Sequence, residues 1–318
     1  MELGLYFAVC NSMPFEAALE HVASLGYTCI ELSTHTGGRF DVAEMLSNGK
    51  WQEVSAAVKA AGLRISAINM SSDGQLVLGP HNSDTDVIHP GTAAEKIRYG
   101  TDRMLMAADL AHKMQIRVIT GFTGCEDYSR WFPWPDEHAW ERMEPVFVER
   151  WTPILKRMDE LEIYFAMECH PRQIVYNTET ALRSVELLGH HPSWSFNLDP
   201  ANLMLAGVDP VVFAAELGPR VVNVHAKDGE LVTHNARRSG LLAHGAWDRI
   251  DRGFRFRIAG WGDIPWRKLI TELALQGYKG PLTVEHEDAT MSSLEGIQKA
   301  ADFLSPLLIR ESFPGRWW

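Results

Sequence analysis

Residues 163–188 read IYFAMECHPRQIVYNTETALRSVELL, and the fold follows from the pattern in this stretch. The short apolar run Ile163–His170 is typical of a buried strand, and Thr178–Leu188 repeats its apolar residues with the period of a helix. Parallel strands need a crossover connection, which is usually a helix. A strand–helix unit of this kind therefore predicts a strand within a parallel sheet.

The same unit recurs along the whole chain, eight times in all. The other predicted strands are Leu3–Val9, Cys29–Ser33, Arg64–Met70, Arg117–Thr123, Trp194–Asp199, Val221–Asp228 and Pro281–Asp288. The other predicted helices are Pro14–Leu25, Lys50–Ala61, Thr92–Met114, His138–Leu161, Asp209–Leu217, Ile264–Gln276 and Ser293–Ile309. Repeated units of this order indicate an α/β protein with a parallel sheet. Eight of them fit a closed (β/α)8 barrel better than an open sheet, so we expect residues 1–318 to form a single barrel domain.

Composition narrows the class of protein. The chain has 41 acidic and 30 basic residues and a formal net charge of -11, which disfavours binding to nucleic acid or to an anionic membrane. It has no apolar run long enough to span a membrane, and Met1–Tyr6 lacks the basic and apolar regions of a signal peptide. The four cysteines are widely spaced, as is typical of reduced thiols. We therefore expect a cytoplasmic enzyme.

Three connections are longer than a compact barrel needs. Residues 71–91, 124–137 and 229–262 each follow a predicted strand. In a barrel of this kind the chemistry takes place at the C-terminal ends of the strands and in the loops that follow them. Long loops in compact domains usually have a function, so we expect these three segments to surround the site.

Ionisable residues gather at the C-terminal ends of the last four predicted strands. Side chains at positions i and i+2 share one face of a strand, and such faces carry Glu168 and His170, Asn197 and Asp199, Asn223, His225 and Lys227, and Thr283, Glu285 and Glu287. Buried charges need partners or a metal ion. Three carboxylates and one imidazole at a barrel mouth predict a site for one divalent cation, with the ligands Glu168, Asp199, His225 and Glu285. This donor set favours Mn²⁺, with Mg²⁺, Co²⁺ and Zn²⁺ as alternatives.

Around these residues the chain resembles the sugar phosphate isomerase/epimerase family of xylose isomerase-like TIM barrels, which includes D-tagatose 3-epimerase and inosose dehydratase. The matching motifs are Glu168-Cys169-His170-Pro171, Asn197-Leu198-Asp199-Pro200, His225-Ala226-Lys227-Asp228, Gly260-Trp261-Gly262-Asp263 and Val284-Glu285-His286-Glu287-Asp288. The resemblance implies that the same four residues bind one divalent cation, usually Mn²⁺. The chain departs from the epimerases at Asn202, where they carry a histidine, and its Lys227-Asp228 resembles the inosose dehydratase side of the family.

Residues and resemblance together predict an enzyme that acts on a small carbohydrate. The lead hypothesis is a divalent-metal-dependent isomerase or epimerase of a keto sugar or related polyol, in which the cation stabilises the enediolate left when the proton next to the carbonyl departs. Glu168 and Glu285 can remove and return that proton, or they only bind the ion and another group is the base. The alternative is a lyase or dehydratase on the same scaffold, which cleaves a 3-keto-glycoside, C-glycosides included, or dehydrates an inosose.

Other side chains are candidates for supporting roles. His170 is expected to be the alternative base or to orient Glu168. Lys227 is expected to neutralise a developing oxyanion, or to pair with Asp228 or Glu287. Contacts with the substrate are predicted for Glu31, Trp131, Asn202 and Glu287, and a surface or barrel-bottom position is an equal alternative for Glu31.

Aromatic and basic clusters leave alternatives open. The aromatic side chains in and after residues 124–137 are expected to cover a sugar or to pack against a neighbouring loop or subunit: Tyr128, Trp131, Phe132, Trp134 and Trp140. Segment 229–262 contains six arginines, which would bind a phosphorylated or acidic substrate, the chain's own barrel or a second subunit. The aromatic tail, residues 313–318, favours a homo-oligomer.

Overall fold

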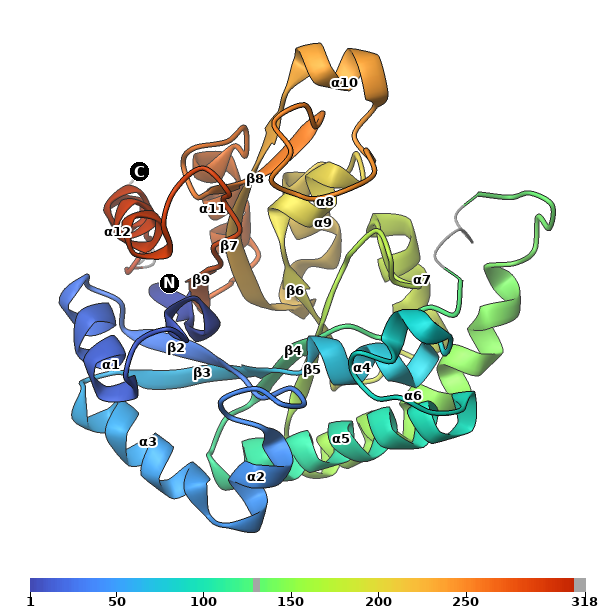
Figure 1. Ribbon diagram of the computed structural model, residues 1–318, viewed down its shortest axis with the longest axis horizontal. Helices are drawn as coiled ribbons and strands as arrows, with labels where there is room; N and C mark the ends of the chain where they lie inside the picture. The colour runs from blue at the N-terminus through green and yellow to red at the C-terminus, as the bar shows by residue number, and fades with distance from the viewer. Residues whose placement is uncertain (128–131, 312–318) are drawn as a thin grey trace, which may run out of the picture.

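The computed structural model describes residues 1–127 and 132–311, and they form a closed barrel of parallel strands surrounded by helices (Figure 1). The barrel strands are β1 (Glu2–Tyr6), β2 (Cys29–Ser33), β3 (Arg64–Asn69), β4 (Val118–Gly121), β5 (Tyr164–Glu168), β6 (Trp194–Leu198), β7 (Val221–Leu231) and β9 (Pro281–Val284). Each strand pairs in parallel with its neighbours in the chain, and β1 pairs with β9 to close the ring. The predicted (β/α)8 barrel is confirmed.

Two sets of helices complete the fold. Those that cover the barrel are α1 (Phe15–Ser24), α3 (Lys50–Ala60), α5 (Ala93–Lys113), α6 (Glu144–Glu160), α7 (Thr178–Leu187), α9 (Pro210–Leu217), α11 (Trp266–Leu275) and α12 (Ser293–Leu304). Shorter helices lie in the connections that follow strands: α2 (Val42–Ser47), α4 (Ser71–Leu78), α8 (Pro200–Leu205) and α10 (Thr233–Ser239). Among the described residues, no helix combines the length and the apolar composition that crossing a membrane requires.

Aromatic residues fill the core between the barrel and the helices on its β5–β6 side. Trp151 of α6 stacks on Phe165 of β5 with ring centroids 4.6 Å apart, and Trp194 of β6 packs edge-on against Phe147 at 5.4 Å. The Trp194 indole nitrogen donates a hydrogen bond to Ser184 Oγ of α7 at 2.9 Å. These buried rings pack the helices against the strands that carry the candidate site, and the hydrogen bond of Trp194 ties β6 to α7.

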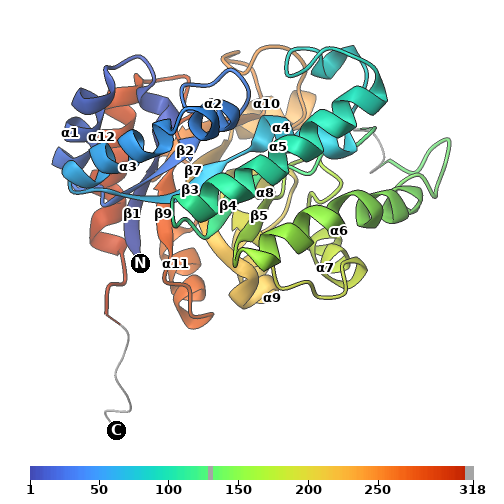
Figure 2. The same cartoon turned by 90° about the horizontal axis from the view of Figure 1, so that it is seen from below.

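The structure departs from several predicted elements: the strand Pro281–Asp288 ends at Val284, and residues 71–91, expected to be a loop, contain α4. The predicted strand Leu3–Val9 ends at Tyr6, and Phe7–Cys10 forms a short 3-10 turn instead. Segment 229–262, expected to be a loop, contains regular secondary structure. β7 continues to Leu231 and pairs antiparallel with β8 (Phe254–Ile258), and α10 lies between them in the sequence. We call residues 229–262 the arm. Figure 1 shows α10 projecting from the barrel, and Figure 2 shows α10 and α4 at the same end of the molecule.

The arginines of the arm mostly bind the chain itself. Arg257 donates to Asp288 Oδ2 at 2.9 Å, and Arg249 forms an ion pair with Asp251 at 3.0 Å. Arg255 lies 3.8 Å from a Glu230 carboxylate oxygen, and Arg252 is buried. Because these four guanidinium groups are engaged within the arm and the barrel, the structure favours an intramolecular role for them over phosphate recognition.

Candidate metal centre and active-site pocket

Four acidic and imidazole side chains meet at the C-terminal ends of neighbouring strands. Glu168 ends β5, Asp199 follows β6, His225 lies in β7 and Glu285 follows β9. Each offers one ligand atom, and these atoms all lie within 4.8 Å of one another. Because parallel strands end at the same rim of a barrel, side chains that are up to 117 positions apart in the sequence converge there.

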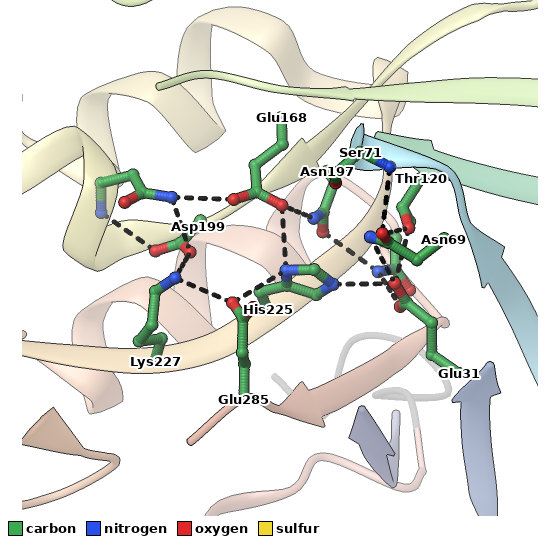
Figure 3. Close-up of polar contacts among 12 residues, drawn as sticks. Glu31, Asn69, Ser71, Thr120, Glu168, Asn197, Asp199, His225, Lys227 and Glu285 are labelled. Carbon is green, nitrogen blue, oxygen red and sulfur yellow. Dashed lines mark hydrogen bonds and ion pairs between the residues drawn. The ribbon is translucent and has the colours of Figure 1, made fainter. Parts of the chain in front are cut away.

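His225 lies at the centre of this cluster (Figure 3). Its Nδ1 atom is 3.0 Å from Glu168 Oε2 and 3.2 Å from Glu285 Oε2, yet it is buried and makes no hydrogen bond within the described residues. On the other side of the ring, Nε2 is 3.0 Å from Glu31 Oε1. If Nε2 donates its proton to Glu31, Nδ1 carries a lone pair that points at the carboxylates. A lone pair and carboxylates that face one point form a ligand set for a cation.

Asp199 is positioned by the helix that follows it. Its Oδ1 accepts hydrogen bonds from the backbone N–H groups of Ala201 and Asn202 at 2.9 and 3.0 Å, so it caps the N-terminus of α8. Pro200 suits the first helical position. The Asp-Pro sequence therefore fixes one carboxylate oxygen to the backbone and leaves Oδ2 facing the cluster.

Asn202, one turn into α8, links two of the carboxylates. Its Nδ2 donates to Glu168 Oε1 at 2.8 Å and to Asp199 Oδ2 at 3.0 Å. The Oδ1 atom of Asn202 is buried and has no partner among the described residues. This oxygen can accept a hydrogen bond from a hydroxyl group that enters the pocket, as predicted for a substrate contact.

Glu31 lies behind His225 inside the barrel rather than in the pocket. It is fully buried, and besides His225 its oxygens receive hydrogen bonds from Thr120 Oγ1 at 2.5 Å and Asn223 Nδ2 at 3.1 Å. Asn69 Nδ2 approaches at 3.3 Å. The predicted contact between Glu31 and sugar hydroxyls does not fit this position, because no part of the side chain reaches the pocket. The geometry assigns it instead to orienting His225.

Lys227 brings a positively charged ammonium group into the cluster. Its Nζ lies 2.8 Å from Asp199 Oδ2, 2.9 Å from Glu285 Oε2 and 3.3 Å from Glu287 Oε2. Of the two partners predicted for it, the structure shows Glu287 and not Asp228. The Asp228 carboxylate instead accepts four hydrogen bonds at the base of the arm, from the N–H groups of residues 229, 260 and 264 and from the Trp266 indole.

The charges of the cluster fit a bound cation. The cluster contains more carboxylates than basic groups, and most of these groups are buried. The carboxylates are those of Glu168, Asp199, Glu285, Glu287 and Glu31, and the basic groups are those of Lys227 and His225. Burial alone would lower the pKa of His225, but Glu31, Glu285 and Glu168 raise it well above its ordinary value. For Asp199, burial raises the pKa to about 7, although the positive charge of Lys227 acts to lower it. Buried negative charge that draws protons in this way is the environment that a divalent cation stabilises.

The cluster lies at a pocket of about 390 Å³. Six of the predicted site residues line it: Glu168, His170, Asn202, Lys227, Glu285 and Glu287. Asp199 and His225 are almost completely buried beside them. Burial, with help from Lys227 and Arg172, lowers the pKa of His170 to about 3, so its imidazole is neutral at pH 7. An imidazole with so low a pKa is a weak base, so this position suits orienting a neighbouring group better than accepting a proton.

The predicted aromatic cover from the loop after β4 does not reach the pocket in its described part. Phe132 and Trp134 are exposed, and the Trp140 indole donates to the Ile174 carbonyl at 3.0 Å, away from the pocket. Trp131 and Tyr128 lie outside the described residues, as does the aromatic tail.

Sequence reasoning missed part of the pocket wall. The pocket is also lined by residues that were not predicted as site residues: Tyr6, His35, Ser71, Ser72, Phe122, Trp247 and Phe256. His35 lies two residues beyond the end of β2, so the rule that identified the charged residues on later strands could have found it. Trp247 and Phe256 belong to segment 229–262, which was expected to surround the site, but no sequence pattern distinguishes them from the other aromatic residues of the chain.

Known proteins resemble the chain in both sequence and fold. The uncharacterized protein YfiH of Bacillus subtilis is 28% identical over 327 residues, which covers 96% of this chain and 98% of that protein. A probable 3-DHS dehydratase, AsbF, of Bacillus anthracis superposes with a TM-score of 0.68 at 16% identity, covering 96% of this chain and 99% of the other. A D-psicose 3-epimerase superposes with a TM-score of 0.66 at 17% identity, covering 97% and 99%. These two likenesses show the fold alone. A family model matches residues 19–307, nearly the whole barrel, and the chain therefore belongs to the xylose isomerase-like TIM barrel family.

Proposed function

We propose that this protein is a divalent-metal-dependent isomerase or epimerase that acts on a keto sugar or a related polyol. The observation that carries the proposal is the placement of Glu168 and Glu285. They come from strands on either side of β6 and β7, face His225 Nδ1 at 3.0 and 3.2 Å, and both line the pocket. Two carboxylates that reach one pocket from different strands can exchange protons with different faces of a substrate carbon.

The two carboxylates differ in how free they are to act. Glu168 Oε1 accepts from Asn202 and its Oε2 accepts from Asn197 at 2.8 Å, so both oxygens are held. Glu285 Oε2 contacts His225 and Lys227, whereas Oε1 has no hydrogen bond in the described part of the chain, and the side chain is 14% exposed. We assign proton removal to Glu285 and proton return to Glu168.

The chemistry follows from these positions. When bound, a divalent cation supplies a Lewis acid for the negative charge that develops on the substrate oxygen. Glu285 takes the proton from the carbon beside the carbonyl, and the C–H electron pair becomes the C=C bond of an enediolate. For epimerisation Glu168 starts as the carboxylic acid and returns its proton to the opposite face, which inverts the carbon. For isomerisation the proton goes to the former carbonyl carbon, while the hydroxyl proton of the adjacent carbon moves to the former carbonyl oxygen. Lys227 adds positive charge next to the developing oxyanion.

The second candidate is a lyase or dehydratase, and the position of Lys227 favours it. An ammonium group 2.9 Å from Glu285 and 3.3 Å from Glu287 places a proton donor beside the base. After the same proton removal, a hydroxyl or alkoxide on the next carbon would leave with a proton from this group, and the enediolate would collapse to an unsaturated ketone.

Incubation in D₂O separates the two reactions. The Mn²⁺-loaded protein would be mixed with ketohexoses and with 3-keto-glycosides, and products would be followed by NMR. An isomerase or epimerase incorporates deuterium at the reacting carbon without loss of water or aglycone. Release of a leaving group would instead support the lyase. Wild-type protein that neither exchanges deuterium with these substrates nor releases a leaving group from them would contradict both.

Matched variants tie the exchange to the site. Glu285→Gln is expected to reduce deuterium incorporation about 10²- to 10⁴-fold, the usual contribution of a general base. Glu295→Gln removes a glutamate of α12 that pairs with Lys299 at 2.7 Å on the surface, and it should exchange like wild type. Equal rates in the two variants would remove Glu285 from the mechanism.

A further inference from the structure

The arm brings an aromatic pair to the wall of the pocket. Trp247 and Phe256 line the same cavity as Glu168 and Glu285, and their ring centroids are 5.0 Å apart. The Phe256 ring lies 4.8 Å from Lys227 Nζ. Because Lys227 contacts the carboxylate cluster, a chain of contacts through Phe256 and Lys227 connects Trp247 to the candidate metal centre.

The arm holds Trp247 in place without burying it. The Arg252 guanidinium carbon lies 4.0 Å from the centre of the indole, and its Nη1 donates to the carbonyls of Gly245 and Ala246 at 2.9 and 3.2 Å. Arg252 is 3% exposed, whereas Trp247 is 49% exposed. A large aromatic ring that a buried arginine fixes at a cavity, with half its surface open, is suited to contact a ligand.

The root of the arm has a small apolar core of its own. Phe254 and Phe256 pack edge-on at 5.2 Å and form a separate cluster with residues of α8, namely Ala201 and Leu205. Gly229 is needed there, because a Cβ atom at this position would lie 2.8 Å from the Phe254 ring. Phe256 therefore packs against α8, the helix that Asp199 caps.

The wall across the pocket is polar. It is formed by Asn69 of β3 and by Ser71 and Ser72 at the start of α4, with His35 after β2. Strands β3 and β7 are four steps apart in either direction around the ring of eight, so they lie on opposite sides of the barrel. A ligand in this pocket has one side against the aromatic rings of the arm and the other mostly against hydroxyl, amide and imidazole groups, with Phe122 after β4 beside them.

We propose that Trp247 and Phe256 form a subsite for the apolar face of a ring, so that the substrate is a hydroxylated ring ketone, whose carbonyl stays free while the ring is closed, rather than an open-chain keto sugar. A saturated ring carries C–H groups on its faces and hydroxyl groups around its rim, and aromatic side chains pack on the faces. An open-chain polyol keeps no such face. The identity of the substrate as a keto compound rests on the proposed function, whereas the ring preference rests on the arm.

Two unreactive polyols test this preference. The compounds 1,5-anhydro-D-glucitol and D-glucitol both have six carbons, but only the first is closed into a ring, and neither has a carbonyl group to react. Calorimetric titration of the Mn²⁺-loaded protein is expected to show tighter binding of the ring compound. Trp247→Ala should weaken binding of the ring compound about 3- to 10-fold, as expected for loss of one aromatic contact, and leave D-glucitol binding unchanged.

Control variants separate the subsite from a general loss of structure. Trp247→Phe keeps an aromatic face and should retain most of the preference. Trp261→Ala removes another half-exposed tryptophan, which lies over Lys299 at 4.3 Å and does not line the pocket, and it should bind both polyols like wild type. Wild-type protein that binds the two polyols equally or not at all, or a Trp247→Ala variant with unchanged ring affinity, would overturn the subsite.

These binding results are independent of the reaction. A ring preference that depends on Trp247 supports the subsite even where the D₂O experiment shows no exchange, in which case only the proposed function fails. Deuterium exchange without a ring preference leaves the proposed function standing and rejects the subsite.

Discussion

The two halves of the barrel mouth carry different kinds of side chain. Strands β5, β6, β7 and β9, which we call the metal-facing half, supply the four atoms that lie within 4.8 Å of one another. Strands β2, β3 and β4, the supporting half, supply Glu31, Asn69 and Thr120, which are buried and bonded to one another. The two halves meet at His225, with its Nδ1 facing one and its Nε2 facing the other. Residues of the metal-facing half would contact a cation directly, whereas residues of the supporting half hold His225 in position.

The largest effect is expected in the metal-facing half. Asp199→Asn keeps an oxygen that can cap α8 but removes the negative charge that faces Lys227 and the cluster. Its affinity for Mn²⁺, measured by calorimetry, should fall by more than about 100-fold, the upper range for residues that only support a ligand. An affinity within tenfold of wild type would show that Asp199 is not a ligand.

Glu31→Gln tests the supporting half, and a smaller loss of Mn²⁺ affinity is expected, about 10- to 100-fold. The glutamine amide would present N–H groups to the hydrogen-bond donors of Thr120, Asn223 and His225, which now share a carboxylate. Glu2→Gln is the matched control, because Glu2 pairs with Arg64 in an exposed position away from the pocket. If Glu31→Gln binds Mn²⁺ as the control does, the division between the halves is wrong.

The ion pair of Asp41 and Arg103, next to the supporting half, is expected to contribute to folding stability and not to Mn²⁺ affinity. The pair lies at 2.9 Å between the β2–α2 connection and α5. Burial alone would raise the pKa of Asp41, but Arg103 and backbone N–H groups lower it below its ordinary value. The stabilisation is therefore complete above about pH 4, the unfolded pKa, and disappears as the pH falls through the lower folded value.

Urea unfolding of Asp41→Asn follows from this. The variant should lose about 1.5 kcal/mol at pH 7, the contribution of a charge-assisted hydrogen bond. The difference from wild type should shrink below about pH 4, because the Asp41 carboxylate of the unfolded chain is protonated there before that of the folded chain. A difference that stays constant down to pH 3 would show that the charge of Asp41 contributes nothing. Mn²⁺ affinity at pH 7 should be unchanged.

Thr120→Val is expected to have the smallest effect. Valine has nearly the same shape, and it removes the hydroxyl that donates to Glu31 and accepts from Asn69. The loss should be about 1 kcal/mol of folding stability, the usual contribution of one hydrogen bond, with a Mn²⁺ affinity a few-fold lower. Thr28→Val, whose hydroxyl bonds Glu2 near the surface, serves as control. Thermal unfolding of both variants, with and without Mn²⁺, distinguishes them.

The sequence predicted the metal-facing half better than the supporting half. The alternation of side chains along a strand is a local rule, and it was enough to group Glu168, Asp199, His225 and Glu285. The role of Glu31 depends on a contact with His225, 194 positions away, which no local pattern reports. The barrel itself was predictable because strand–helix units repeat, so an error at one strand end does not change the count.

The arm was not predictable from the same patterns. Residues 229–262 follow no strand–helix alternation, and their short strand β8 becomes recognisable only through its antiparallel pairing with an extended β7. Its buried side chains Phe254, Phe256 and Ile258 alternate with Arg255 and Arg257. The arginines left three alternatives open, an anionic substrate, the chain's own barrel or a second subunit, and the ion pairs of Arg257 with Glu230 and Asp288 fit the second of these.

Closure of the barrel has a consequence for the order in which the protein matures. The ligand atoms come from residues 168 to 285, and the group that orients His225 comes from residue 31, so the complete set exists only after the first and last strands have paired. Contacts of such long sequence separation form late in folding. A cation that binds only the finished site should slow unfolding and leave the folding rate unchanged. A cation of this kind would meet a chain that has already reached its native topology.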